Sequence, residues 1–127
     1  MFDITRNGII TMNRGDTWKT KIYVNVGTEL DPHGYPLKSN DYLYFGVMEP
    51  NQPFDRALIR KRYDASSAVG PSEEDEGWYW IEFDVEDTEK VLPGTYYYEV
   101  KLLRARDDPD KVDIDTIIPK TKFVIYE

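Results

Sequence analysis

The chain has no cysteine, a single histidine and no long hydrophobic run among its 127 residues. Without cysteine, neither a disulfide framework nor a thiolate-ligated metal site can form. The one histidine, His33, lies in the turn-like segment Asp31-Pro32-His33-Gly34 and has no companion at the spacing that zinc binding or acid–base catalysis needs. His33 is therefore expected to be a solvated loop residue, and no cofactor is expected.

Basic residues are scarce relative to acidic ones, since 16 Lys and Arg stand against 24 Asp and Glu for a formal charge of −8. The phosphates of a nucleic acid would be repelled without a basic stripe, so a nucleic-acid partner is not expected. The first residues hold no apolar core of signal-peptide length, and no segment approaches the length of a membrane span. The expectation is a protein made in the cytoplasm, with no signal peptide and no membrane contact.

The chain is rich in aromatic residues and in short alternating segments. Aromatic residues make up 14% of the sequence, including ten tyrosines, and each buries a large area when it enters a core. Apolar and polar residues alternate with period two, which is typical of half-buried strands. Strands are predicted at 8–12, 17–26, 42–49, 57–64, 78–85, 95–104, 112–118 and 121–127. The side chains expected to face inward are Trp18, Thr20, Ile22, Val24, Val26, Leu43, Phe45, Val47, Ala57, Ile59, Tyr79, Ile81, Phe83, Val85, Tyr96, Tyr98, Val100 and Leu102.

Turn signals separate these strands. Asn13-Arg14-Gly15-Asp16 and Asp108-Pro109-Asp110 have turn chemistry, and Pro119 is expected to interrupt the chain between the last two strands. Residues 64–77 are polar and acidic and are predicted to form a flexible loop, whereas 86–92 is predicted to be one helical turn that crosses between sheets. The sequence thus predicts an all-β, Ig-like antiparallel β-sandwich of seven to eight strands with one short helical turn, in a single domain of residues 1–127.

Several short motifs have a simpler structural explanation than a functional one. Arg14-Gly15-Asp16 spells the tripeptide that integrins recognise, but it lies where a tight turn needs glycine. The acidic clusters 73–76 and 107–110 do not match the alternating pattern of an EF-hand, and Asp113 with Asp115 gives only a weak calcium signal. No metal ligands and no catalytic residues are therefore expected.

Outward-facing aromatic residues give the candidate interface. If Tyr79 and Phe83 point inward, Trp78 and Trp80 point outward together, and Tyr97 faces outward from the strand at 95–104. Exposed tryptophans often mark a protein interface or a sugar platform. The candidate interface residues are Trp78, Trp80 and Tyr97.

The order of motifs also resembles a known family. ITMNRGDTWKTKIYV, YLYFGVMEP, LIRKR, WYWIEFDVEDTEKVLPGTYYYEVKLL and KFVIYE together resemble the β-sandwich domain found at the N-terminus of phage baseplate upper proteins. The most specific part is Leu92-Pro93-Gly94-Thr95-Tyr96-Tyr97-Tyr98-Glu99-Val100, preceded by Glu86-Asp87-Thr88. The resemblance implies an Ig-like sandwich that serves as a structural or adaptor piece of a tailed phage particle, without enzymatic activity.

Two functions follow as alternatives. The first is a phage structural or adaptor protein of the tail, baseplate or capsid surface, located in the virion and forming homo-oligomers and contacts with other virion proteins. The second is an Ig-like carbohydrate-binding module or surface adhesin in which Trp78, Trp80 and Tyr97 stack on sugar rings. An enzyme such as a glycosidase would need two carboxylates in a cleft, and nothing in the sequence selects such a pair.

Overall fold

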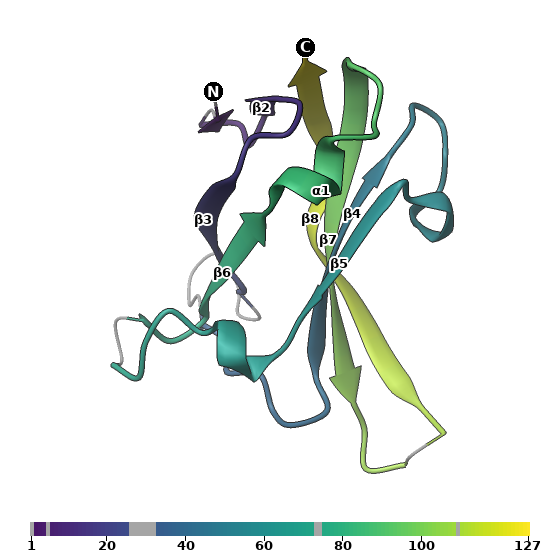
Figure 1. Ribbon diagram of the computed structural model, residues 1–127. Helices are drawn as coiled ribbons and strands as arrows, with labels where there is room; N and C mark the ends of the chain where they lie inside the picture. Colours follow the sequence, from purple (N-terminus) through teal and green to yellow (C-terminus); the bar gives the residue numbers. More distant parts are fainter. Residues whose placement is uncertain (1, 5, 26–32, 73–74, 109) are drawn as a thin grey trace.

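The computed structural model describes residues 2–4, 6–25, 33–72, 75–108 and 110–127, and these residues build two β-sheets (Figure 1). The strands are β1 (Asp3–Ile4), β2 (Ile10–Asn13), β3 (Trp18–Tyr23), β4 (Tyr42–Met48), β5 (Ile59–Tyr63), β6 (Trp78–Phe83), β7 (Gly94–Ala105) and β8 (Val112–Tyr126). The helical segments are η1 (Phe54–Arg56), η2 (Ala65–Ser67) and α1 (Val85–Thr88). The larger sheet has the order β1-β2-β8-β7-β4-β5, and the smaller one consists of β3 and β6. The predicted all-β architecture is confirmed.

One strand pair differs from the wholly antiparallel arrangement expected from the sequence. β2 and β8 run parallel, with Ile10 beside Phe123 and Met12 beside Ile125. The turn after β2 carries the chain into the other sheet, so β2 takes its neighbour from the far end of the sequence. In that turn the amide of Asp16 donates to the carbonyl of Asn13 at 3.1 Å, and Gly15 adopts a φ of +83°.

The core lies between the two sheets and is largely aromatic. Trp18 of β3 stacks on Phe83 of β6 with ring centroids 4.5 Å apart, and Phe83 meets the ring of Phe45 on β4 edge-on at 5.5 Å. Phe45 in turn stacks on Tyr98 of β7 at 5.1 Å, so a chain of rings joins the sheets. The buried cluster contains Ile10, Met12, Trp18, Ile22, Val24, Leu37, Leu43, Phe45, Val47, Ile59, Tyr63, Tyr79, Ile81, Phe83, Tyr96, Tyr98, Val100, Leu102, Phe123 and Ile125.

Most of the side chains expected to face inward do so, with a few exceptions. Thr20 is only half-buried, and Val26 lies outside the described residues. Val85 is 46% exposed because β6 has ended and Val85 is the first residue of α1, which confirms a helical turn near the predicted place. Ala57 caps the end of η1, so the predicted strand at 57–64 is shorter than expected and begins at Ile59.

The prediction that Pro119 separates two strands is wrong, because β8 continues through it as one strand of 15 residues. The register against β7 shifts twice near Val100, so Pro119 lies at an irregularity of the ladder. β2 pairs only with residues 123–126 of β8, and among the described residues no strand pairs with the outer edge at 112–118. A proline at a bulge on an edge leaves no ladder hydrogen bond unmade.

The predicted hairpin is confirmed, whereas the predicted flexibility of residues 64–77 stays a prediction. β7 and β8 form the expected hairpin, closed by the pairing of Ala105 with Val112, and it projects beyond the other strands at the lower right of Figure 1. Residues 64–77, predicted to be a flexible loop, contain η2 and a bridge between Ala68 and Tyr79. Asp31, Pro32 and Pro109 of the predicted turns, and residues 73 and 74 of the acidic loop, lie outside the described residues.

Candidate functional site on the sheet faces

Trp78 and Trp80 lie together on the outer face of the two-stranded sheet, where both are half-buried. The antiparallel register places Tyr23 opposite Trp78 and Lys21 opposite Trp80. The Tyr23 and Trp78 rings lie 5.1 Å apart, Lys21 Nζ is 5.0 Å from the Trp78 ring, and Lys19 Nζ is 4.5 Å from the Trp80 ring. These five residues, Lys19, Lys21, Tyr23, Trp78 and Trp80, are called the tryptophan face below.

The tryptophan face combines large apolar area with positive charge. An ammonium group over an indole ring is attracted by the negative face of the ring, by about 0.5–1 kcal/mol at an exposed site. Each of the two indoles therefore already has a lysine over its ring, while the remaining ring surface and the lysine tips face solvent. Such a surface can bury aromatic area and pair with acidic groups in one contact.

The neighbouring edge of β6 is partly covered by side chains of β5. The Tyr63 hydroxyl donates to the carbonyl of Glu82 at 3.0 Å, and Lys61 Nζ donates to the same oxygen at 2.7 Å. Lys61 also forms an ion pair with Asp87 of α1 at 2.8 Å. Lys61 therefore lies between the sheets and links β5 to both β6 and α1.

Tyr97 does not join the two tryptophans. It lies on β7 between Tyr96 and Tyr98, which face the core, so its half-buried side chain lies on the outer face of the six-stranded sheet. Its cross-strand neighbours are Met48 and Lys122. Because the core separates the sheets, the three candidate interface residues fall on opposite sides of the molecule.

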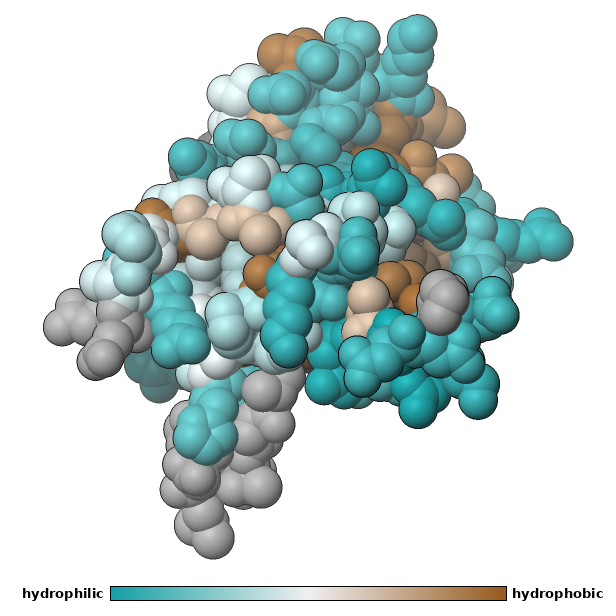
Figure 2. Space-filling model, turned by 90° about the horizontal axis from the view of Figure 1, so that it is seen from below, coloured by the Kyte–Doolittle hydropathy of each residue, from teal (hydrophilic) through white to brown (hydrophobic). Residues whose placement is uncertain are grey.

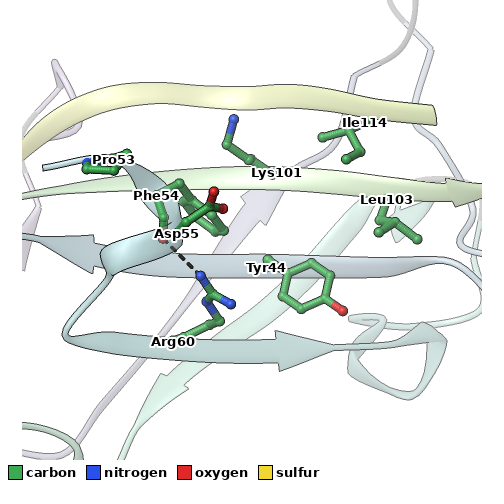
Figure 3. A pocket seen from close by; sticks show the side chains of 8 residues that line it. All are labelled: Tyr44, Pro53, Phe54, Asp55, Arg60, Lys101, Leu103 and Ile114. Atoms are coloured by element: carbon green, nitrogen blue, oxygen red, sulfur yellow. Dashed lines mark hydrogen bonds between the residues drawn. The ribbon is translucent and has the colours of Figure 1, made fainter. Parts of the chain in front are cut away.

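A pocket of about 460 Å³ opens on the outer face of the six-stranded sheet (Figure 3). η1 lays the ring of Phe54 across Gly46 of β4, where an added Cβ would lie 2.6 Å from Phe54 Cε2. The close packing of the Phe54 ring on β4 therefore requires glycine at position 46. The lining residues, called the outer-sheet pocket below, are Tyr44, Pro53, Phe54, Asp55, Arg60, Lys101, Leu103 and Ile114.

Two cations flank the phenyl ring of this pocket. The Arg60 guanidinium lies 5.4 Å from the Phe54 ring centroid, and its Nη2 donates to the Phe54 carbonyl at 3.0 Å. Lys101 Nζ lies 5.5 Å from the same ring and 3.7 Å from Glu99 Oε2. The sequence did not predict this pocket, although a glycine inside the alternating strand at 42–49 can signal a close approach of another part of the chain.

Asp41 is a buried acidic residue, only 1% exposed, and its carboxylate accepts hydrogen bonds from the protein itself. Its Oδ2 accepts from the Tyr35 hydroxyl at 2.6 Å and from the Lys38 amide at 2.9 Å, and its Oδ1 accepts from the Ala105 amide at 2.9 Å. Burial alone would raise the pKa of Asp41, but these hydrogen bonds to the charged form hold it below its usual value. Burial, together with the Asp41 carboxylate, raises the pKa of Tyr35 to about 12.

The Arg14-Gly15-Asp16 turn is built into the structure, as predicted. The Gly15 amide donates to Oγ1 of the buried Thr88 in α1 at 2.8 Å. Arg14 forms an ion pair with Glu127 at 2.6 Å. The turn thus fastens β2 to α1 and to the last residue of the chain.

The remaining candidate residues are placed as follows. His33 is exposed, and its amide donates to Asn25 Oδ1 at 3.0 Å. Asp113 and Asp115 each face an arginine, at 3.8 Å from Arg106 and 2.7 Å from Arg104. Among the described residues, no group of three or more His, Asp or Glu is arranged to hold a metal ion.

The surface and the helices add two general observations. On the face seen from below, hydrophilic side chains cover most of the surface, and hydrophobic ones form separate patches (Figure 2). In the part of the chain that the structure describes, no helix has the length and apolar character needed to cross a membrane.

Comparison with known proteins identifies no relative. A scan against protein-family models, a search of curated proteins and a search of solved structures each found no match. The function must therefore be argued from the residues and their arrangement.

Proposed function

We propose that this chain is a non-enzymatic structural or adaptor protein of a tailed phage particle, folded as one domain and located in the tail, the baseplate or the capsid surface. It assembles with other virion proteins and with copies of itself. The observation that carries the proposal is the tryptophan face, where Trp78, Trp80 and Tyr23 lie side by side under two lysines. Tryptophan and tyrosine dominate the binding energy of protein interfaces, and the lysines supply charge that selects a partner.

The fold is proposed to be an Ig-like sandwich, as the resemblance to the baseplate family implies. A feature in favour is the hydroxyl of Tyr96, which donates to the carbonyl of Leu92 four residues upstream, just after α1. This matches the tyrosine corner, in which a tyrosine near the start of the sixth strand of an Ig sandwich bonds back to the preceding backbone. The Leu-Pro-Gly-Thr-Tyr segment that carries the resemblance is the segment that forms this corner.

The assembly proposal is tested by sedimentation velocity on the purified chain, alone and mixed with recombinant tail, baseplate and capsid proteins of the same particle. A complex with at least one of them is expected. The Trp78→Ala/Trp80→Ala double variant should lose that complex, because it removes the aromatic area of the tryptophan face. Tyr97→Ala is the matched control, since it truncates an outward aromatic residue on the opposite sheet and should keep the complex. A chain that stays monomeric and binds none of these proteins would overturn the proposal.

The second candidate is an Ig-like carbohydrate-binding module or surface adhesin. It is favoured by the same two indoles, which lie two residues apart on one strand face and could stack on successive sugar rings. Against it, Lys19 and Lys21 already lie over those rings and would have to move. Glycan-array binding by the native chain that disappears in Trp78→Ala and Trp80→Ala would give this function priority over assembly.

A further inference from the structure

The outer-sheet pocket lies across the core from the tryptophan face, and neither the phage assignment nor the tyrosine corner explains it. We propose that it binds an acidic segment of a protein partner, with a carboxylate on Arg60 and a neighbouring aromatic side chain against Tyr44, Leu103 and Ile114. The inference stands apart from the phage assignment, because it uses a different sheet and different residues.

The wall of the pocket is held in place before any ligand arrives. Phe54 fits over Gly46, where any larger residue would collide with its ring. Arg60 donates to the carbonyl of Phe54 from one side, and Lys120 Nζ donates to the carbonyl of Gln52 at 2.8 Å from the other. β5 and β8 thus anchor the loop that carries η1, so binding does not have to order it.

Arg60 provides the positive charge with which the pocket can bind a carboxylate. Its contacts among the described residues are the carbonyl and the ring of Phe54, and no carboxylate of that part of the chain lies within ion-pair distance of it. A guanidinium has five N–H donors, so Arg60 retains donors for a two-pronged carboxylate contact. Lys101 is partly neutralised by Glu99, and Asp55 on the rim allows only one carboxylate to be favourable in the pocket.

The other end of the pocket is apolar. In Figure 3, Phe54 and Asp55 stand at one end, Leu103 and Ile114 at the other, and Tyr44 lies between them. Ile114 is 61% exposed, one of the most exposed large apolar side chains described. An aromatic side chain laid here would remove this area from water, which favours binding in proportion to the area covered. A carboxylate beside an aromatic group therefore matches both ends of the pocket, and alternating acidic and aromatic residues on a peptide supply that pair.

Asp55 lines the pocket and opposes an acidic ligand locally, whereas the rest of the overall charge of −8 acts at longer range. At an ionic strength of about 0.1 M, charges more than about 10 Å apart are largely screened. The pocket is therefore expected to bind its ligand at physiological salt, where the nearby arginine outweighs the distant carboxylates.

The test is an NMR titration of the ¹⁵N-labelled full chain with the capped peptide Gly-Asp-Phe-Gly, which carries one carboxylate, and its neutral counterpart Gly-Asn-Phe-Gly. The acidic peptide should shift amides of β4, β7 and η1 around the pocket, and the neutral peptide should bind about tenfold more weakly. Arg60→Gln should weaken binding of the acidic peptide about tenfold as well. Arg62→Gln is the matched control, because Arg62 is also exposed on β5 and lies over Tyr42 at 4.7 Å, and it should change binding by less than about twofold.

Three results would overturn the proposal. They are equal binding of the two peptides, shifts at the tryptophan face instead of the pocket, and equal effects of the Arg60 and Arg62 variants. If Arg60→Gln disturbs η1, Ile114→Ser provides a second test, since it changes an exposed side chain and should also weaken binding. A separate titration with 3-phenylpropionate distinguishes the source of the carboxylate, because a free acid that binds as tightly as the peptide would mean a small-molecule site.

Discussion

Three consecutive tyrosines on β7 have three different environments. The Tyr96 hydroxyl donates to the carbonyl of Leu92, and the Tyr98 hydroxyl donates to the carbonyl of Gly8, which precedes β2. Both side chains are buried, whereas Tyr97 lies on the outer face. Tyr96 therefore fastens β7 to the segment just before it, and Tyr98 fastens β7 to backbone far away in the chain. A phenylalanine at either position could not make these hydrogen bonds.

Tyr96→Phe is expected to lower the free energy of unfolding by about 1 kcal/mol, since it removes one hydrogen bond and keeps the ring in the core. Equilibrium urea unfolding measures the change. Tyr97→Phe is the control and should alter stability by less than about 0.5 kcal/mol, as is usual for a surface change. Equal losses in the two variants would mean that the corner hydrogen bond does not stabilise the fold.

Asp41 makes the stability depend on pH in acid. The native pKa of Asp41 lies below its usual value, so the unfolded chain binds this proton more readily than the folded one. Its contribution is fully present above the unfolded pKa of about 3.9 and is lost as the pH falls through the lower native pKa. Asp41→Asn should cost about 2 kcal/mol at neutral pH, because an amide group would face backbone N–H donors.

The measurement is urea unfolding of the native chain and of Asp41→Asn from neutral pH down to about pH 2.5, a range that spans the carboxyl titrations. The difference between the two proteins should be constant at neutral pH and should shrink below about pH 4. Subtracting the variant removes the titration of the other carboxylates. A difference that stays constant through the acid range would show that Asp41 is not the titrating group.

At the scale of elements, alternation predicted the strands that bury one face. β3, β4, β6 and β7 carry their predicted inward residues because a half-buried strand imposes period two on its own sequence. The parallel partner of β2 and the continuity of β8 through Pro119 could not be predicted, since both depend on a neighbour far away in the chain. The outer-sheet pocket was missed for the same reason, because it depends on Phe54 meeting Gly46.

The outward position of Trp78 and Trp80 followed from the same alternation, but the separation of Tyr97 from them did not. Each strand pattern states which residues share a face within that strand, and it does not state which sheet the strand joins. β6 and β7 are neighbours in sequence, yet α1 carries the chain from the small sheet to the large one. Trp78, Trp80 and Tyr97 each lie on the outer face of their strand, as alternation predicted, and their role in an interface stays a prediction. Their division over two surfaces could be derived only from the topology.

α1 is expected to depend on Asp87. This side chain accepts the Asp84 amide at 2.7 Å in a capping box and pairs with Lys61 at 2.8 Å, where both charged side chains are 19% exposed. Asp87→Ala should lower the free energy of unfolding by about 2 kcal/mol, because the cap and the ion pair are lost together. Glu86→Ala, one residue away and exposed, should change it by less than about 0.5 kcal/mol.

A double-mutant cycle separates the two roles of Asp87 by urea unfolding. If the ion pair matters, Lys61→Met and Asp87→Ala together should cost less than the sum of the single changes, by about 0.5 kcal/mol or more. Strict additivity would contradict the coupling of β5 to α1 through this pair. The single cost of Asp87→Ala would then be assigned to the capping box.

At the scale of the whole molecule, the order of the large sheet distinguishes central strands, which have a neighbour on each side, from strands with an open edge. β7 and β4 each have a strand on both sides, and β8 has two neighbours only where it also pairs with β2. The tryptophan face and the outer-sheet pocket lie on the outer faces of the two sheets, whereas Val85 and Leu92 are exposed in α1 and in the segment after it. A protein with this arrangement can bind partners on two sides without disturbing its core.

Central and edge strands should differ in the rates at which their backbone amide hydrogens exchange with solvent. Amides of β4 and β7 are expected to exchange most slowly, because opening them requires loss of the central sheet. In β8, residues 123–126 should be protected more than 112–118, where amides that point away from β7 have no strand partner among the described residues. Exchange followed by NMR in dilute solution measures both comparisons.

Equal protection of the two parts of β8 at high dilution would contradict an open edge. Protection of 112–118 that appears only as the concentration rises would show that copies of the chain pair along this edge, because an unpaired strand edge favours such pairing.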